Sequence, residues 1–213
     1  MRELAARLTD WSGPDISVAL SLVAGESGML PPEEDAVARA IPKRRAEFAA
    51  GRRAAREALK AAGLPQTAIL QGDNRAPIWP EGAIGSITHH EGLAVAAVAQ
   101  TRRIKRLGID LAEANDFPEK LRKQILKTAA ERAQTDLEAR VSFSAKESVF
   151  KAFFPDVRAY FGFDAVEVRP DLHQGTFTAR FTRDLGPVAA GAMHHGKVLI
   201  DEACLFTLLA DPA

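Results

Sequence analysis

The spacing of hydrophobic and polar residues changes along the chain and predicts its elements. Residues 42–63 alternate alanines with charged residues between a proline and a glycine, which predicts a long helix with a defined start and stop. The prolines and acids of "PPEEDAVARAI", residues 31–41, predict a shorter helix before it. "GDNRAPIWPEG" is typical of a loop. "IGSITHHEG" predicts a short strand with a turn, and "LAVAAVAQ" predicts a buried strand.

The second half repeats this mixture. "RLGIDLAE", residues 106–113, predicts a strand that ends in acids, and helices are expected at 117–134 and 144–154. Later strands are expected in "FDAVEVRP", "GTFTARF" and "KVLIDEACLFTLLA". This order fits an α+β chain of two comparable lobes joined near residues 101–108. We place the lobes at residues 1–106 and 107–213.

Composition limits the classes of protein. The chain has 213 residues, 46% of them hydrophobic, so it can bury a substantial core. Its 28 basic and 28 acidic side chains cancel, which removes the field expected of a general nucleic-acid binder. We find neither a membrane-spanning run nor a secretory signal and therefore expect a cytoplasmic protein. The single cysteine, Cys204, has apolar neighbours and is expected to be a buried structural thiol.

The predicted helix at residues 42–63 carries an excess of positive charge. Between positions 43 and 60 the chain has seven basic residues and only two acidic ones. They are Lys43, Arg44, Arg45, Arg52, Arg53, Arg56 and Lys60, against Glu47 and Glu57. Guanidinium groups on one side of this helix could bind phosphate. The alternative is a solvated face with intrahelical pairs such as Arg53 with Glu57.

Two strand ends carry polar side chains. "GSITHHEG" places Ser86, Thr88, His89 and His90 where ligands often bind, although histidines in turns are common without one, and the spacing is not that of a zinc site. Asp110 ends an apolar strand, with Glu113 three residues later. It suits a Mg²⁺ site, or it caps the next turn.

The stretch "FSAKESVFKAFFP", residues 143–155, sets charged residues among phenylalanines. Ser144 and Glu147 have the spacing of a capping box, and Glu147 precedes Lys151 by four residues, as in a surface ion pair. Alternatively, Lys146, Glu147 and Lys151 form part of a binding site.

Four segments together resemble the Sfp-type 4′-phosphopantetheinyl transferases, near the branch that serves enterobactin synthase. They are "KRRAEFAAGRRAAREAL", "GDNRAPIWPEGAIGSITHHEG", "GIDLAE" and "FSAKESVFKAFFP". The resemblance implies two similar α+β lobes in a pseudo-dimeric arrangement, with coenzyme A bound between them. It also implies Mg²⁺-dependent transfer of phosphopantetheine from coenzyme A to a serine of an acyl or peptidyl carrier protein, releasing 3′,5′-adenosine bisphosphate.

The resemblance also implies roles for single residues. Arg44 and Arg52 would bind phosphate of the nucleotide, with Arg45 as an alternative to the first. His89 would contact the 3′-phosphate, with Thr88 beside it. Asp110 and Glu147 would hold Mg²⁺, and Glu147 would also take the proton of the serine. In the Lys-Glu-x-x-x-Lys motif, Lys146 and Lys151 would contact coenzyme A, and the catalytic Lys151 would neutralise charge on the leaving group.

The sequence departs from the family pattern at two positions. Ala112 stands where the family commonly has a second acid, and Glu113 replaces it only if the chain turns immediately after Leu111, because a shift of one residue reverses the face of a strand. Otherwise water would complete the magnesium shell. Gln71 stands where close relatives have lysine, and we expect Arg75 of the same loop to supply that charge.

An active transferase of siderophore, polyketide or nonribosomal peptide synthesis is our leading hypothesis. It predicts a monomer without nucleic-acid or membrane partners, and a carrier-binding rim near Lys151 and the phenylalanines after it. One rival is a noncatalytic protein that binds coenzyme A or the carrier. The other is a nucleic-acid module that uses the basic helix, with an affinity that falls steeply with salt.

Overall fold

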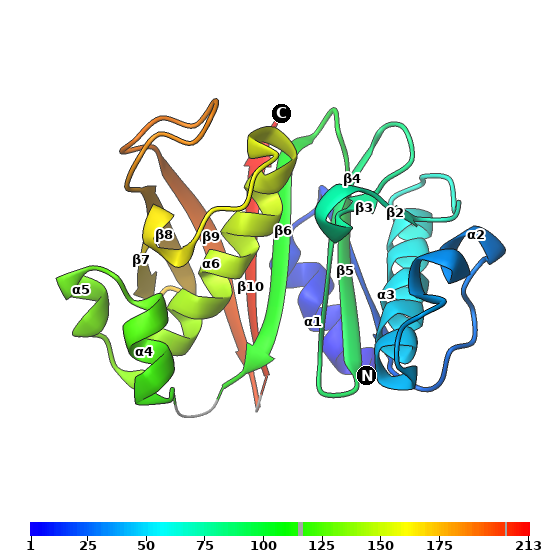
Figure 1. Cartoon of the computed structure of the whole chain (residues 1–213), viewed down its shortest axis with the longest axis horizontal. Helices are drawn as coiled ribbons and strands as arrows, with labels where there is room; N and C mark the ends of the chain where they lie inside the picture. The colour runs from blue at the N-terminus through cyan, green and yellow to red at the C-terminus, as the bar shows by residue number, and fades with distance from the viewer. Residues whose placement is uncertain (115–116, 203) are drawn as a thin grey trace. The chain divides into compact units, whose positions relative to one another are not determined.

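The computed structural model describes residues 1–114, 117–202 and 204–213, which form two compact units (Figure 1). The first unit comprises residues 1–105 with 212–213, and the second comprises residues 106–211. The chain is a mixture of helices and antiparallel sheets, so the predicted α+β class is confirmed. Among the described residues, none of the helices is both long and apolar enough for a membrane span.

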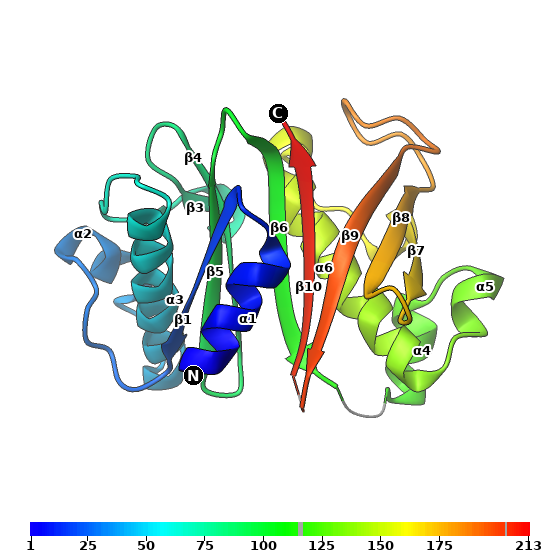
Figure 2. The same cartoon turned by 180° about the vertical axis from the view of Figure 1, so that it is seen from behind.

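The first unit is a three-stranded antiparallel sheet with helices packed on it. Its elements are α1 (Arg2–Ser12), β1 (Ile16–Leu22), α2 (Pro31–Glu34), the 3₁₀ turn η1 (Asp35–Val37), α3 (Pro42–Ala61), β2 (Leu70–Gln71), η2 (Asp73–Arg75), β3 (Pro77–Ile78), β4 (Ala83–His90) and β5 (Leu93–Gln100). The strand order is β1-β5-β4, and β2 pairs with β3. α3 packs along one face of the sheet, and α1 packs beside β1 (Figure 2).

Small residues let α3 lie close to the sheet. Ala54, Ala55 and Ala58 are fully buried in a cluster with residues of β5. A Cβ atom on Gly51 would lie 2.9 Å from Ile87 of β4. The alanine-rich pattern that predicted the helix is therefore also its packing surface, and the expected helix at residues 42–63 is confirmed.

The second unit is a five-stranded sheet covered on one face by a long helix. Its elements are β6 (Ile104–Glu113, whose first two residues belong to the first unit), α4 (Glu119–Ile125), α5 (Ala129–Arg132), α6 (Asp136–Val157), η3 (Phe163–Ala165), β7 (Val166–Asp171), β8 (Thr176–Phe181), β9 (Met193–Asp201) and β10 (Cys204–Pro212). The strand order is β6-β10-β9-β8-β7. Figure 2 shows these strands in front of α6.

Three expectations for the second half are wrong. The helix expected at 117–134 is two short helices, α4 and α5. α6 begins at Asp136, because Thr135 and Glu138 form a capping box there. Ser144 therefore lies inside the helix, so its capping interpretation with Glu147 is wrong. Cys204 is partly exposed in β10 and not buried.

Candidate active-site residues

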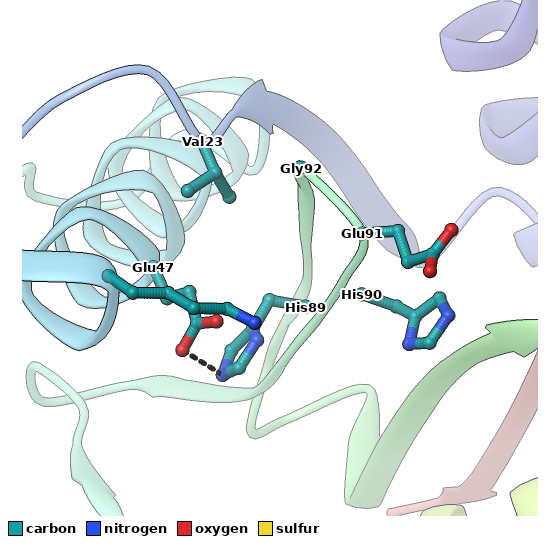
Figure 3. Close-up of a pocket in the computed structure, with 7 residues that line it drawn as sticks. Val23, Glu47, His89, His90, Glu91 and Gly92 are labelled. Atoms are coloured by element: carbon teal, nitrogen blue, oxygen red, sulfur yellow. Dashed lines mark ion pairs between the residues drawn. The ribbon is translucent and has the colours of Figure 1, made fainter.

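A pocket opens in the first unit between the start of α3 and the turn that joins β4 to β5. Its volume is about 500 Å³, and it is lined by Val23, Lys43, Glu47, His89, His90, Glu91 and Gly92 (Figure 3). Glu91 and Gly92 both have positive φ angles, as a tight two-residue hairpin turn requires. The turn thus holds the last residues of β4 beside the helix.

Arg44 and His89 meet at this pocket. Nη1 of Arg44 lies within hydrogen-bond distance of Nε2 of His89, at 2.8 Å. The carboxylate of Glu47 lies 3.7 Å from Arg44 and 3.8 Å from His89. Figure 3 shows His89 turned toward Glu47 and His90 turned away. The arrangement offers a partly exposed guanidinium and an imidazole to an anion.

Thr88 lies on the other face of the sheet. In the register of β4 with β5, His89 is opposite Ala94 and Ile87 is opposite Ala96, and Ile87 and Ala96 belong to the cluster under α3. Alternate side chains of a strand point to opposite faces, so buried Thr88 points away from α3. The sequence places Thr88 beside His89, but the structure does not bring its side chain to the pocket.

Most of the other arginines of α3 hold the segment between β1 and α3. Arg45 binds Glu26 over 2.6 Å and the carbonyl of Val37 over 3.1 Å. Arg53 donates to the carbonyl of Leu22 over 2.8 Å and to the carbonyl of Ser27. The predicted solvated face with an Arg53–Glu57 pair is therefore wrong, and of Arg44 and Arg45 only Arg44 has its guanidinium beside His89.

Arg56 and Arg52 lie further along α3, and both are held by the fold. Nη1 of Arg56 lies 2.6 and 2.7 Å from the two carboxylate oxygens of fully buried Glu33. Arg52 is buried, its guanidinium lies 4.0 Å from the centre of the Phe48 ring, and its Nε donates to the carbonyl of Ile69 over 2.7 Å. Burial lowers the pKa of Arg52 to about 10, against the opposing effect of Glu33. These contacts anchor Arg52 in the fold.

Arg75 is exposed in the turn between β2 and β3. Its φ angle is 66° and that of Asn74 is 52°, so two consecutive non-glycine residues take the left-handed conformation. The turn directs the chain sharply back into β3. A contact of Arg75 with the nucleotide stays a prediction.

A second group of candidate residues lies where β6 meets α6 in the second unit. Asp110 is 7% exposed; its Oδ1 accepts from Nζ of Lys151 over 2.7 Å and its Oδ2 accepts from Oγ of Ser144 over 2.9 Å. Ser144 also shares a hydrogen bond of 2.9 Å with Thr207 of β10. Sequence reasoning missed Ser144 as a partner of Asp110, although its spacing of three and seven residues from Glu147 and Lys151 places all three on one helix face.

Gly108 makes this contact between strand and helix possible. A Cβ atom at Gly108 would lie 1.9 Å from the carbonyl oxygen of Ser148 and 2.8 Å from the backbone nitrogen of Ala152. Both atoms are backbone of α6, so no side-chain movement could make room. The glycine of "GIDLAE" thus brings the backbone of β6 directly against α6 and places Asp110 within reach of Lys151.

Glu147 belongs to the same electrostatic group. Burial raises its pKa, the ammonium of Lys151 opposes this shift, and the carboxylate of Asp110 adds to it. Glu147 also lines a small cavity of about 70 Å³ with aromatic walls that include Phe150, Tyr160 and Phe161. The two carboxylates supply hard oxygen ligands, and a divalent cation between them would relieve their mutual repulsion. The residues therefore fit a Mg²⁺ ion.

Neither Ala112 nor Glu113 adds a third carboxylate to this group. Ala112 is 6% exposed and packs in the apolar cluster with Val141 and Ala145. β6 continues through Glu113, so the turn after Leu111 that would bring Glu113 to the face of Asp110 does not occur. Instead, the charge of Glu113 acts on Arg140, whose pKa is lowered by burial and raised in part by Glu113.

Lys146 points into the protein interior. Its Nζ lies 2.7 Å from Oε1 of Glu131 and donates to the carbonyls of Ile125 and Phe163 over 2.9 and 2.8 Å. The side chains of Lys146 and Glu131 are 2% and 1% exposed, and burial lowers the pKa of Lys146 against the opposing effect of Glu131. Glu131 also accepts from the backbone nitrogen of Val168. This geometry gives Lys146 a structural role, and its predicted contact with the cofactor stays untested.

Comparison with known proteins shows which family the chain belongs to. Residues 32–99 match the family model of the 4′-phosphopantetheinyl transferase N-terminal domain, and residues 106–202 match that of the 4′-phosphopantetheinyl transferase superfamily. The chain is 38% identical over 205 residues to the 4′-phosphopantetheinyl transferase Svp of Streptomyces mobaraensis, covering 88% of this chain and 79% of that protein.

Two further relatives match shorter parts of the chain. The 4′-phosphopantetheinyl transferase PptT of Mycobacterium tuberculosis is 35% identical over 159 residues, 71% of this chain and 70% of that protein. Enterobactin synthase component D of Salmonella typhi is 35% identical over 147 residues, 64% of this chain and 59% of that protein. The predicted resemblance is therefore confirmed, and the chain belongs to the 4′-phosphopantetheinyl transferase family.

Proposed function

We propose that this protein transfers the 4′-phosphopantetheine group of coenzyme A to a serine of an acyl or peptidyl carrier protein, with Mg²⁺, and releases 3′,5′-adenosine bisphosphate. The observation that carries the proposal is the group formed by Asp110, Glu147 and Lys151, two carboxylates and an ammonium on β6 and α6. Membership of the transferase family supports the reaction class.

The nucleotide phosphates are assigned to the first unit. Arg44 and His89 already contact each other at an open pocket, and together they offer donors to a phosphate. A phosphate there would compete with Glu47, whose carboxylate lies within 4 Å of both side chains. Arg52 is assigned a supporting role, because its burial and its stacking on Phe48 add fixed positive charge close to Arg44. Arg75 is retained as a further phosphate contact.

The chemical step is assigned to the second unit. Oγ of the carrier serine forms a bond to the β-phosphorus as the bond from that phosphorus to the oxygen of the leaving nucleotide breaks. Bound Mg²⁺, held by Asp110 and Glu147, would neutralise charge on the pyrophosphate. Lys151 supplies a positive charge beside the oxygens of the leaving group. Glu147 is the nearest carboxylate to take the proton of the serine.

The relatives suggest the pathway and the setting. Enterobactin synthase component D is named for an assembly that makes a siderophore, so we propose a carrier domain of siderophore, polyketide or nonribosomal peptide synthesis. Both groups of candidate residues lie in one chain, and we propose a monomer that acts in the cytoplasm on coenzyme A. The carrier would dock near Lys151 and the partly exposed aromatic residues Phe150 and Phe154.

Replacement of the base tests the reaction. Glu147→Gln keeps the shape of the side chain but removes its charge, so transfer to an apo carrier should fall by at least about 100-fold. Coenzyme A binding, measured by calorimetry without Mg²⁺, should stay within a few-fold of the original. Glu57→Gln, at an exposed position of α3, is the matched control and should keep full activity. Full activity in Glu147→Gln would remove Glu147 from the mechanism.

One observation favours a second function. Ala112 leaves the metal group without the acid that the family commonly places there, and the structure buries this position among apolar side chains. A noncatalytic homologue that binds coenzyme A or the carrier fits that loss. Such a protein would bind coenzyme A but would leave every apo carrier unmodified, with Mg²⁺ present in excess.

A further inference from the structure

Lys151 occupies one carboxylate oxygen of Asp110, the proposed metal ligand. Its Nζ lies 2.7 Å from Oδ1 and donates over 3.0 Å to the carbonyl of Ile109, so both partners belong to β6. The Asp110 side chain is 10% exposed and that of Lys151 is 25% exposed. The ammonium therefore neutralises a carboxylate that water reaches poorly, as a bound cation would.

Asp110 has little freedom to offer a different oxygen. Its Oδ2 accepts from Ser144, and Ser144 is held by Thr207, which also forms a hydrogen bond of 2.7 Å with Ser148. All these side chains except that of Lys151 are buried. A cation that binds Asp110 at Oδ1 would therefore compete with the ammonium for this oxygen, because the neighbouring hydroxyls fix the carboxylate in place.

The two lysines of the motif differ in how firmly they are held. The ammonium of Lys146 has an ion pair and two carbonyls around it and is almost fully buried. Lys151 is partly exposed, and its four-carbon stem can carry the ammonium to a new anion while its backbone stays in α6. The exchange at Asp110 thus requires only a change of side-chain rotamer.

We propose that Lys151 is a built-in substitute for the metal ion: it holds Asp110 in the free protein and releases it when the pyrophosphate of coenzyme A gives the ammonium another partner. This inference rests on the proposed function, because it takes Asp110 as a metal ligand. Metal and coenzyme A then bind with positive coupling, and by reciprocity each tightens the other by the same factor. The metal loads fully only when substrate is present.

The test is Mn²⁺ binding, measured by electron paramagnetic resonance of the free ion, without and with coenzyme A. Lys151→Met keeps the stem and removes the charge, so its Mn²⁺ affinity without coenzyme A should rise about tenfold or more, within the range of coupled sites. Coenzyme A should tighten Mn²⁺ binding more in the original protein than in Lys151→Met. Lys151→Arg should retain the weak affinity, as should Lys60→Met, a control at an exposed position of α3.

The outcomes separate this inference from the proposed function. Mn²⁺ binding that Asp110→Asn abolishes but that Lys151→Met leaves unchanged or weaker would overturn the substitution while keeping the metal site. If neither the original protein nor Lys151→Met binds Mn²⁺ with coenzyme A present, both the metal site and the inference fail. Circular dichroism and a second variant, Lys151→Gln, with the same expected rise in affinity, guard against a folding defect in Lys151→Met.

Discussion

Adjacent arginines of α3 serve different purposes, and the difference can be measured. The guanidinium of Arg44 lies beside His89 at the pocket, whereas that of Arg45 holds Glu26 and the carbonyl of Val37. The sequence predicted both as candidates, because both are basic and adjacent. Side chains one position apart on a helix point in different directions, so only one of them faces the pocket. Only the folded segment between β1 and α3 decides which of them reaches the pocket.

Arg44→Ala should weaken coenzyme A binding, and Arg45→Ala should not. A hydrogen bond to a charged group contributes about 1.5–3 kcal/mol, so we expect about a tenfold to hundredfold loss of affinity for Arg44→Ala by calorimetry. Arg45→Ala is the matched control; its partly exposed ion pair is worth about 1 kcal/mol or less, and its loss should appear only as a lower melting temperature. The reverse assignment would show that Arg45 holds the phosphate.

Ala112 gives a second prediction at this scale. A carboxylate at this position would be buried in the apolar cluster beside Val141 and Ala145, where an uncompensated charge is costly. Ala112→Glu should therefore lower the melting temperature without metal, and Mg²⁺ should restore part of the loss. Ala112→Gln is the uncharged control, and Mg²⁺ should leave its melting temperature unchanged. Equal responses of the two variants would show that position 112 does not face the metal group.

At the scale of elements, the contact between β6 and α6 places the proposed catalytic group. Gly108→Ala would insert a methyl group into backbone atoms of Ser148 and Ala152, so the strand and the helix would have to separate. We expect a loss of about 1–3 kcal/mol in the free energy of unfolding, measured with denaturant, together with weaker Mn²⁺ binding. Gly162→Ala, where the new atom would meet only the carboxylate of Asp164, is the control. A Gly108→Ala protein of unchanged stability would contradict the close packing.

The sequence predicted most elements but not how their faces meet. The proline start and the glycine stop predicted α3, and the predicted short strand with a turn and buried strand were found as β4 and β5, because these signals are local. α6 was predicted too short, since Thr135 and Glu138 cap it upstream of the motif that drew attention to Ser144. The separation of Thr88 from His89 followed from strand alternation and was available from the sequence.

The burial of Lys146 was not available from the sequence. Its partner Glu131 lies fifteen positions earlier, and the pairing depends on the break between α4 and α5 and on the position of Phe163. Local spacing placed Lys146 in the same charged motif as Lys151. Tertiary packing then turned one ammonium into the interior and the other toward Asp110.

At the scale of the whole molecule, each unit carries one group of candidate residues. Arg44 and His89 belong to the first unit, and Asp110, Glu147 and Lys151 belong to the second. Family membership was predictable because four motifs in register span both units. The identity of the carrier protein is a property of its own surface, which the pattern of this chain does not encode.

The most direct test of the central claim is the intact mass of an apo carrier protein after incubation with this protein, coenzyme A and Mg²⁺. We predict a gain equal to one phosphopantetheine, lost when a chelator removes the metal and restored when Mg²⁺ is added back in excess. A panel of acyl and peptidyl carriers that all keep their original mass, under conditions where coenzyme A binds, would contradict the transferase and leave a binding protein as the better account.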